Sequence, residues 1–220
     1  AVSAQLGLFA LAFALLVGIP AGIIAAMHHG SWRDRSATLV AIIGVSVPAI
    51  VLGPVLQWLF ALQLGWFPVA QWASLSEGLI PYLSHIILPA VTLGAGLSAI
   101  IARLTRASML SVLGEDYIRT AHAKGLARRV VTVRHALRNA LIPVVTYLGP
   151  LAAAVLTGSL VVEQIFAIPG MGRYFVTSIS GRDYPMVMAV VVLYALIIVG
   201  VNLLVDILYT VIDPRIGHGN

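Results

Sequence analysis

Long stretches without a single charged side chain dominate this sequence and constrain its fold more than any other feature. Asp, Glu, Lys and Arg are absent from residues 1–32, 36–76, 78–102, 139–162 and 184–205. A helix needs about 20 apolar residues to cross a hydrocarbon core about 30 Å thick. A charged side chain placed at mid-bilayer would cost about 2.5–3.5 kcal/mol. The pattern therefore predicts an all-α integral membrane protein with several spans, in keeping with a chain that is 60% hydrophobic and 10% charged.

The distribution of Lys and Arg between the expected connections predicts the orientation. Connections on one side of the membrane, with their flanks, would carry 11 of these residues, and those on the other side would carry 2. Because Lys and Arg accumulate on the cytoplasmic side, we expect the richer side and the C-terminus to be cytoplasmic. No linker divides the chain, so we expect one transmembrane domain over residues 1–220. Five spans are expected, near residues 6–27, 39–64, 86–110, 140–162 and 186–212.

The composition excludes several classes of function. The chain has no cysteine, which rules out disulfide scaffolds and thiolate chemistry. The net charge of +5 is concentrated beside the expected spans, which indicates topology rather than nucleic-acid binding. The six histidines are scattered and form no metal-binding pattern.

The sequence also lacks the phosphate-binding loop of ATPases. That loop ends in Gly-Lys followed by Ser or Thr, whereas Lys124, the only lysine, lies between Ala123 and Gly125. We therefore expect no enzyme activity and no cofactor in this chain. The energy for any transport must come from a partner protein or from an ion gradient.

Residues 115–126 form a short charged island between the third and fourth expected spans. Glu115 and Asp116 are typical of the positive end of a helix dipole, at its N-terminus. Gly125 suits the left-handed position that ends a helix. The sequence therefore predicts a short helix with its own start and stop signals.

One face of this expected helix combines an aromatic residue with small ones. Tyr117, Ala121 and Gly125 recur at i, i+4 and i+8 and so share a face, which Arg119 and Lys124 flank. A surface of this shape would fit a groove in another protein. The alternative is an ordinary solvated loop whose cations only set the membrane topology.

Residues 116–145 resemble the cytoplasmic loop of bacterial ABC importer permeases. Asp-Tyr-Ile-Arg-Thr-Ala-His-Ala-Lys-Gly-Leu and the later Arg-His-Ala-Leu-Arg-Asn-Ala-Leu-Ile-Pro-Val-Val carry the resemblance, most closely to the B-type subunit of the dipeptide/oligopeptide/nickel branch. Residues 163–173 resemble that branch's external loop, and Asp-Tyr-Pro at 183–185 and residues 202–215 resemble its last span and tail. The broader family has Glu-Ala-Ala where residues 119–121 read Arg-Thr-Ala, and its loop proline comes earlier than Pro143; both departures resemble the peptide branch.

The resemblance implies a type I importer permease domain with about five transmembrane helices and a cytoplasmic coupling helix. B-type relatives also carry an N-terminal helix and an external segment, which we expect upstream of this chain. The implied location is the bacterial inner membrane. The implied partners are a homologous C-type permease, two cytoplasmic ATPase subunits or domains that hold ATP and Mg²⁺, and an external substrate-binding protein. The residues implied in ATPase coupling are Asp116, Tyr117, Arg119, Thr120, Ala121, Lys124, Gly125 and Leu126.

The segment after the fourth span has two interpretations. Glu163 and Gln164 either cap that helix at the interface, or they belong to an external gate together with Pro169, Gly170 and Gly172. The turn-rich sequence around Pro169 is compatible with a loop that dips toward a substrate path.

The substrate implied by the resemblance is a dipeptide or oligopeptide, with nickel or another small solute as the alternative. A different class, an ion-gradient-driven secondary transporter, would need ionisable residues deep in the membrane. Asp206, four residues after Asn202, is the one candidate within the spans, and hydrogen bonding between helices is the interpretation we favour for it.

Overall fold

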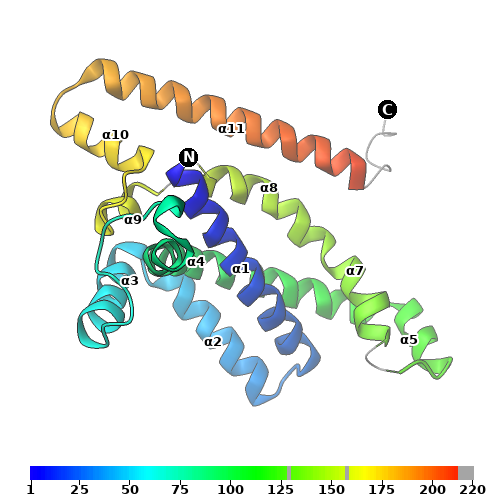
Figure 1. Cartoon of the computed structure of the whole chain (residues 1–220). Helices are drawn as coiled ribbons and strands as arrows, with labels where there is room; N and C mark the ends of the chain where they lie inside the picture. The colour runs from blue at the N-terminus through cyan, green and yellow to red at the C-terminus, as the bar shows by residue number, and fades with distance from the viewer. Residues whose placement is uncertain (128–129, 157–158, 213–220) are drawn as a thin grey trace. The chain divides into compact units, whose positions relative to one another are not determined.

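The computed structural model describes residues 1–127, 130–156 and 159–212, and every regular element within them is helical (Figure 1). The side chains of His122, Val205, Asp206 and 208–212 lie outside this description. Contacts divide the chain into two compact units. Unit 1 contains Ala1–Ala12, Val47–Gly94 and the residues from Gly149 on, and unit 2 contains Phe13–Ser46 and Ala95–Leu148.

Four segments are long and apolar enough to cross a membrane, and a fifth is possible. The four are α1 (Val2–Met27), α4 (Leu79–Leu113), the segment Ile142–Ile165, and Tyr184–Leu204 within α11 (Tyr184–Ile212). The fifth is present if α2 (Trp32–Ser46) and the segment Ala49–Gln63 form one broken span. The expected all-helical, multi-span class is confirmed, with the second span as the point of difference.

The second expected span, over residues 39–64, is broken at Val47 and Pro48. α2 ends at Ser46, and α3 (Ala49–Leu56) begins after Pro48, which has an extended ψ of 144°. Proline has no N–H to donate and disfavours a helical conformation in the residue before it. Pro48 is therefore the physical reason for the break, and the second expected span is present if the two helices form one broken span.

Unit 1 has a core of aliphatic and aromatic side chains. Leu6, Ile86, Val162, Phe166 and Ile168 are all buried at its centre. The short helices α9 (Leu160–Ile165) and α10 (Met171–Ser180) belong to this unit, as does the π-helical turn η1 (Gln57–Gln63). This core holds the segment between α9 and α10 that the sequence marked as a possible gate.

Unit 2 has a separate core around α5 (Asp116–Ala123). Ile118 and Ala121 of α5 pack with Met109 near the end of α4 and with Val131 and Ala136. The last two come from the π-helical turn η3 (Val131–Ala136), which α7 (Leu137–Ala140) follows. The predicted coupling helix is therefore anchored by apolar side chains on one side.

Candidate functional site

The start and stop signals of α5 act as the sequence predicted. Asp116 lies in the first turn, and the helix ends just before Gly125, which has the left-handed φ of +73°. The N–H of Leu126 donates to the carbonyl of Ala121 at 3.4 Å, the outer hydrogen bond of a Schellman ending. A helix of eight residues is too short to be stable alone, so it depends on these ends and on its anchored side.

The face that combines Tyr117, Ala121 and Gly125 is only partly available to another protein. Ala121 is 7% exposed and packs inside unit 2. Tyr117 remains 41% exposed, and its hydroxyl accepts a hydrogen bond of 2.8 Å from the amide of Asn139. The sequence interpretation omitted Ile118, whose burial beside Tyr117 draws this side of the helix toward the chain's own core.

The remaining surface of α5 and its end is exposed and charged. Thr120 donates its hydroxyl hydrogen to the carbonyl of Asp116 at 3.0 Å, and Arg119 lies 3.5 Å from the Asp116 carboxylate. Because such an exposed pair contributes little, about 0.2–1 kcal/mol, a partner protein can replace it at low cost. Seven of the eight expected coupling residues are exposed here: Asp116, Tyr117, Arg119, Thr120, Lys124, Gly125 and Leu126.

Asn139 ties α5 to the segment that follows it, and sequence reasoning missed this residue. Its side-chain amide donates to Tyr117, whose hydroxyl in turn lies 3.5 Å from the carbonyl of His135 (Figure 1 shows α5 beside α7). The pair spans 22 residues of sequence, so no local pattern predicts it. The one available signal is an amide at the edge of a charge-free stretch.

In unit 1, the Glu163 side chain is completely buried and binds the N-terminus of α10. Its Oε2 accepts hydrogen bonds from the N–H of Gly172 at 2.7 Å and of Arg173 at 3.2 Å. These N–H groups lie in the first turn of α10, where a carboxylate also interacts favourably with the helix dipole. Glu163 therefore caps α10, and not the end of its own span as one interpretation expected.

Gly170 and Gly172 make room for this carboxylate. A Cβ atom at Gly170 would overlap the carboxyl group of Glu163, and one at Gly172 would lie 2.9 Å from its Oε2. The structure thus brings together three of the five expected gate residues. The other two, Gln164 and Pro169, are exposed.

Gln57 joins this segment to the connection that precedes Ser74, a role that no local sequence pattern predicts. Its side-chain amide donates to the carbonyl of Ile165 at 3.2 Å and to that of Val69 at 2.7 Å. The N–H of Gln71 also donates to the carbonyl of Phe166 at 2.9 Å. Two segments far apart in sequence are therefore linked within unit 1.

An all-helical chain with several apolar spans and a charged, anchored helix between two of them defines a multi-span membrane protein. Residues 18–218 match the family model described as "Binding-protein-dependent transport system inner membrane component". The chain belongs to this family. It is a multi-pass permease subunit of an ABC importer, a non-catalytic component, and the resemblance inferred from the sequence is confirmed.

The chain is similar to several curated proteins. It is 49% identical to the dipeptide transport system permease protein DppB of Bacillus subtilis (strain 168) over 215 residues, which are 98% of this chain and 67% of the relative. It is 45% identical to the glutathione transport system permease protein GsiC of Escherichia coli (strain K12) over 206 residues, 94% of this chain and 65% of the relative. The chain thus spans about two thirds of the length of these relatives.

Solved structures share the fold. An inward-facing structure of the MetNI methionine ABC transporter matches with a TM-score of 0.77 at 16% identity, over 96% of this chain and 93% of the other. A structure of an amino acid ABC transporter with histidines matches with a TM-score of 0.69 at 16% identity, over 94% of this chain and 88% of the other.

Family membership favours the binding-protein-dependent class over the ion-gradient-driven alternative. Asp206, on which that alternative relied, has a side chain outside the described part of the structure.

Proposed function

We propose that this chain forms half of the translocation path of an ATP-driven importer of dipeptides or short oligopeptides. Relatives named for dipeptide, peptide and glutathione transport, at 43–49% identity, support this substrate class over nickel. The other half would be a homologous C-type permease, and an external binding protein would deliver the peptide. The chain lies in the bacterial inner membrane with its C-terminus in the cytoplasm.

The observation that carries the proposal is the two-sided character of α5. One side, with Ile118 and Ala121, is buried in the core of unit 2. The other side, with Asp116, Arg119 and Thr120, is exposed and polar. A helix fixed to its own chain on one side and open on the other suits a contact through which a cytoplasmic ATPase subunit moves the permease.

The anchoring gives a route for that movement. When two ATPase subunits close around ATP and Mg²⁺, they displace the docked α5. Because Ile118 packs with Met109 of α4 and with Val131 of η3, a displacement of α5 must carry both neighbours with it. This is a two-state change driven by ligand binding at a distant site.

The segment from Glu163 to Gly172 is the proposed external gate. The capping of α10 by Glu163 and the hydrogen bonds of Gln57 give this segment one defined conformation within unit 1. A gate needs such a defined closed state if its opening is to be controlled.

Gly125→Trp in the full-length permease, assembled with its partner subunits in lipid vesicles, tests the coupling function. We expect uptake of tritiated alanyl-alanine per ATP hydrolysed to fall by about tenfold or more, the scale of a lost interface contact. Gly65→Trp is the matched control, because Gly65 also has a left-handed φ, +63°, with open space around it. Unchanged uptake and unchanged peptide-stimulated ATP hydrolysis in Gly125→Trp, with normal assembly, would contradict the coupling role.

The substrate class is tested separately by competition in the unmodified importer. We expect unlabelled dipeptides to compete with tritiated alanyl-alanine and Ni²⁺ to have no effect. Saturable nickel uptake without peptide uptake would place this importer in the nickel branch and leave the coupling role intact.

A further inference from the structure

Asp34 in unit 2 is a buried carboxylate that the proposed function does not yet explain. It is 4% exposed and lies in the first turn of α2. Arg106 of α4 binds it with both ends of its guanidinium fork, Nε to Oδ1 at 2.6 Å and Nη2 to Oδ2 at 2.8 Å. The N–H of Gly30 donates to Oδ2 at 3.0 Å, and Nδ1 of His29 lies 3.1 Å from the same oxygen.

This arrangement is a specific joint between the α1–α2 connection and α4. A buried ion pair is stable only when its geometry is good and its remaining hydrogen-bonding positions are occupied. Both conditions hold for Asp34. Each carboxylate oxygen accepts a hydrogen bond from Arg106, and Oδ2 also accepts one from the N–H of Gly30. Buried ion pairs contribute little net stability, and their best-attested use is to fix the register of one element against another.

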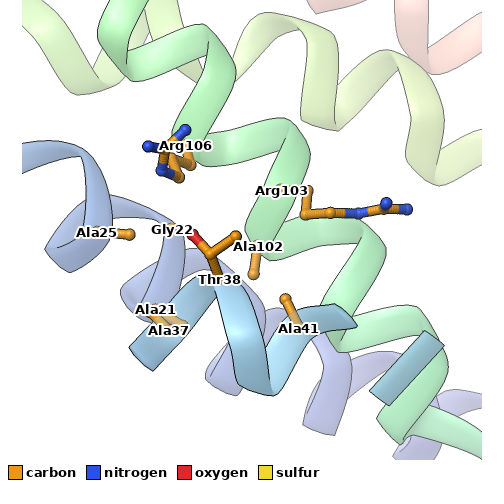
Figure 2. A pocket seen from close by; sticks show the side chains of 9 residues that line it. All are labelled: Ala21, Gly22, Ala25, Ala37, Thr38, Ala41, Ala102, Arg103 and Arg106. Atoms are coloured by element: carbon orange, nitrogen blue, oxygen red, sulfur yellow. The ribbon is translucent and has the colours of Figure 1, made fainter. Parts of the chain in front are cut away.

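The surfaces on which α2 and α4 meet need such a fixed register. Ala37, Thr38 and Ala41 of α2 and Ala102 of α4 line one small pocket with Gly22 of α1, and Figure 2 shows these short side chains around it. Farther along, a Cβ at Gly44 would lie 3.2 Å from the Cβ of Ala99. Small side chains let helices approach closely, and the Asp34–Arg106 ion pair adds a directional contact beside them.

Arg106 also lies on the route from the coupling helix. It is about two turns before the end of α4 at Leu113, and α5 begins three residues after that end. Met109, between Arg106 and Leu113, packs in the same core as Ile118 of α5. A displacement of α5 therefore reaches Arg106 through a continuous helix.

We propose that Asp34 is a positioning residue for transport, which makes the α1–α2 connection move together with α4 when α5 is displaced. The inference rests on the proposed coupling function of α5. Without Asp34, α4 would slide on the small side chains of α2, and ATP hydrolysis would no longer be converted into peptide movement. The residue acts through Arg106 and contacts neither the ATPase nor the peptide.

The test compares Asp34→Asn with the double variant Asp34→Asn/Arg106→Gln in the full-length permease, assembled with its partners in vesicles. Tritiated alanyl-alanine uptake per ATP hydrolysed and the melting temperature of the complex are both measured. For Asp34→Asn we expect uptake per ATP to fall about tenfold, within the range of long-range coupling effects. We also expect a lower melting temperature, because the Arg106 charge loses its partner. Glu77→Gln, which makes the same carboxylate-to-amide change in an exposed capping residue, is the control for uptake.

The double variant separates positioning from stability. It removes both charges, so its melting temperature should return toward that of the unchanged protein, while uptake per ATP stays low because the joint is still missing. Normal uptake per ATP in Asp34→Asn overturns the inference, and so does a double variant that regains uptake together with stability. If Gly125→Trp uncouples transport and Asp34→Asn does not, only this inference fails. If neither variant uncouples, the proposed coupling function fails as well.

Discussion

At the scale of single residues, Gly170 and Gly172 show that a glycine can be required for space rather than for backbone freedom. Gly170 has φ −96° and ψ 171°, an extended conformation that any residue adopts. Its importance comes from the Glu163 carboxyl group, which occupies the position that a side chain would need. The two glycines allow a buried carboxylate to reach the N–H groups of α10 directly.

Gly170→Ala tests this account. The added methyl group must displace the Glu163 carboxyl, so we expect a loss of about 1–3 kcal/mol, as for other overpacked sites. The measurement is thermal unfolding of the purified permease in detergent. Gly200→Ala in α11 is the control, because nothing lies within 4 Å of the added Cβ there. We expect no loss in the control, and a gain of up to about 0.5–1 kcal/mol from the better helix former. Equal melting temperatures for the two variants would contradict the proposed role of Gly170.

At the scale of elements, α5 is defined by its ends and by one anchored side. Gly125 has a left-handed φ and no neighbouring atom within 4 Å of a Cβ. A substitution there strains the backbone but collides with nothing in this chain. Backbone effects and partner contacts can therefore be measured separately at this residue.

Gly125→Val and Gly125→Asn make that separation. A left-handed conformation costs most residues about 1–2 kcal/mol, whereas Asn adopts it more readily. We expect Gly125→Val to lower the free energy of unfolding by about this amount and Gly125→Asn to lower it less, by chemical denaturation in detergent. Gly114→Ala, at a glycine without a left-handed φ, is the control for the same connection. Valine and asparagine variants of equal stability would show that φ at residue 125 is not the constraint.

The sequence predicted elements well wherever local signals decide the structure. The charge-free stretches correspond largely to helices. α5 begins at Asp116 and ends just before Gly125, as the helix-start and helix-stop signals of these residues predicted. One helix, α10, was not expected. α10 was missed because its N-terminus is capped by a residue nine positions away and not by its own first residue.

The candidate site could be predicted only in part, because its decisive contacts join distant residues. Asp34 and Arg106 are separated by 72 positions, and Gln57 and Ile165 by 108. No periodicity connects such pairs. A signal did exist for Asp34, which is the only acidic residue in the first 76, because an isolated carboxylate among apolar stretches needs a specific partner. The burial of Ala121 could not be predicted for a related reason, since spacing defines a face but not what covers it.

At the scale of the whole molecule, the orientation of the chain in the membrane is a prediction that labelling of single cysteines can test. The sequence has no cysteine, so a single introduced thiol reports one position. Ser76 and Ser180 are expected outside, Ser36 and Ser111 are expected inside, and all four are exposed. The chain's 11-to-2 imbalance of Lys and Arg is the basis for this orientation.

We expect a membrane-impermeant maleimide to label Ser76→Cys and Ser180→Cys in intact spheroplasts. Ser36→Cys and Ser111→Cys should react only after the membrane is permeabilised. The thiol-free parent chain is the control for background. Labelling of Ser36→Cys from outside would reverse the orientation and place α5 on the side where no ATPase can reach it.

The capping of α10 by Glu163 has a consequence for biogenesis. On the proposed topology this carboxyl group leaves the translocon before residues 170–173 have folded, and the amides that will hold it do not yet exist. Until then a nascent chain exposes an acidic group at the edge of the lipid. The segment from α9 to α10 can therefore reach its final structure only after residues 170–173 have been synthesised.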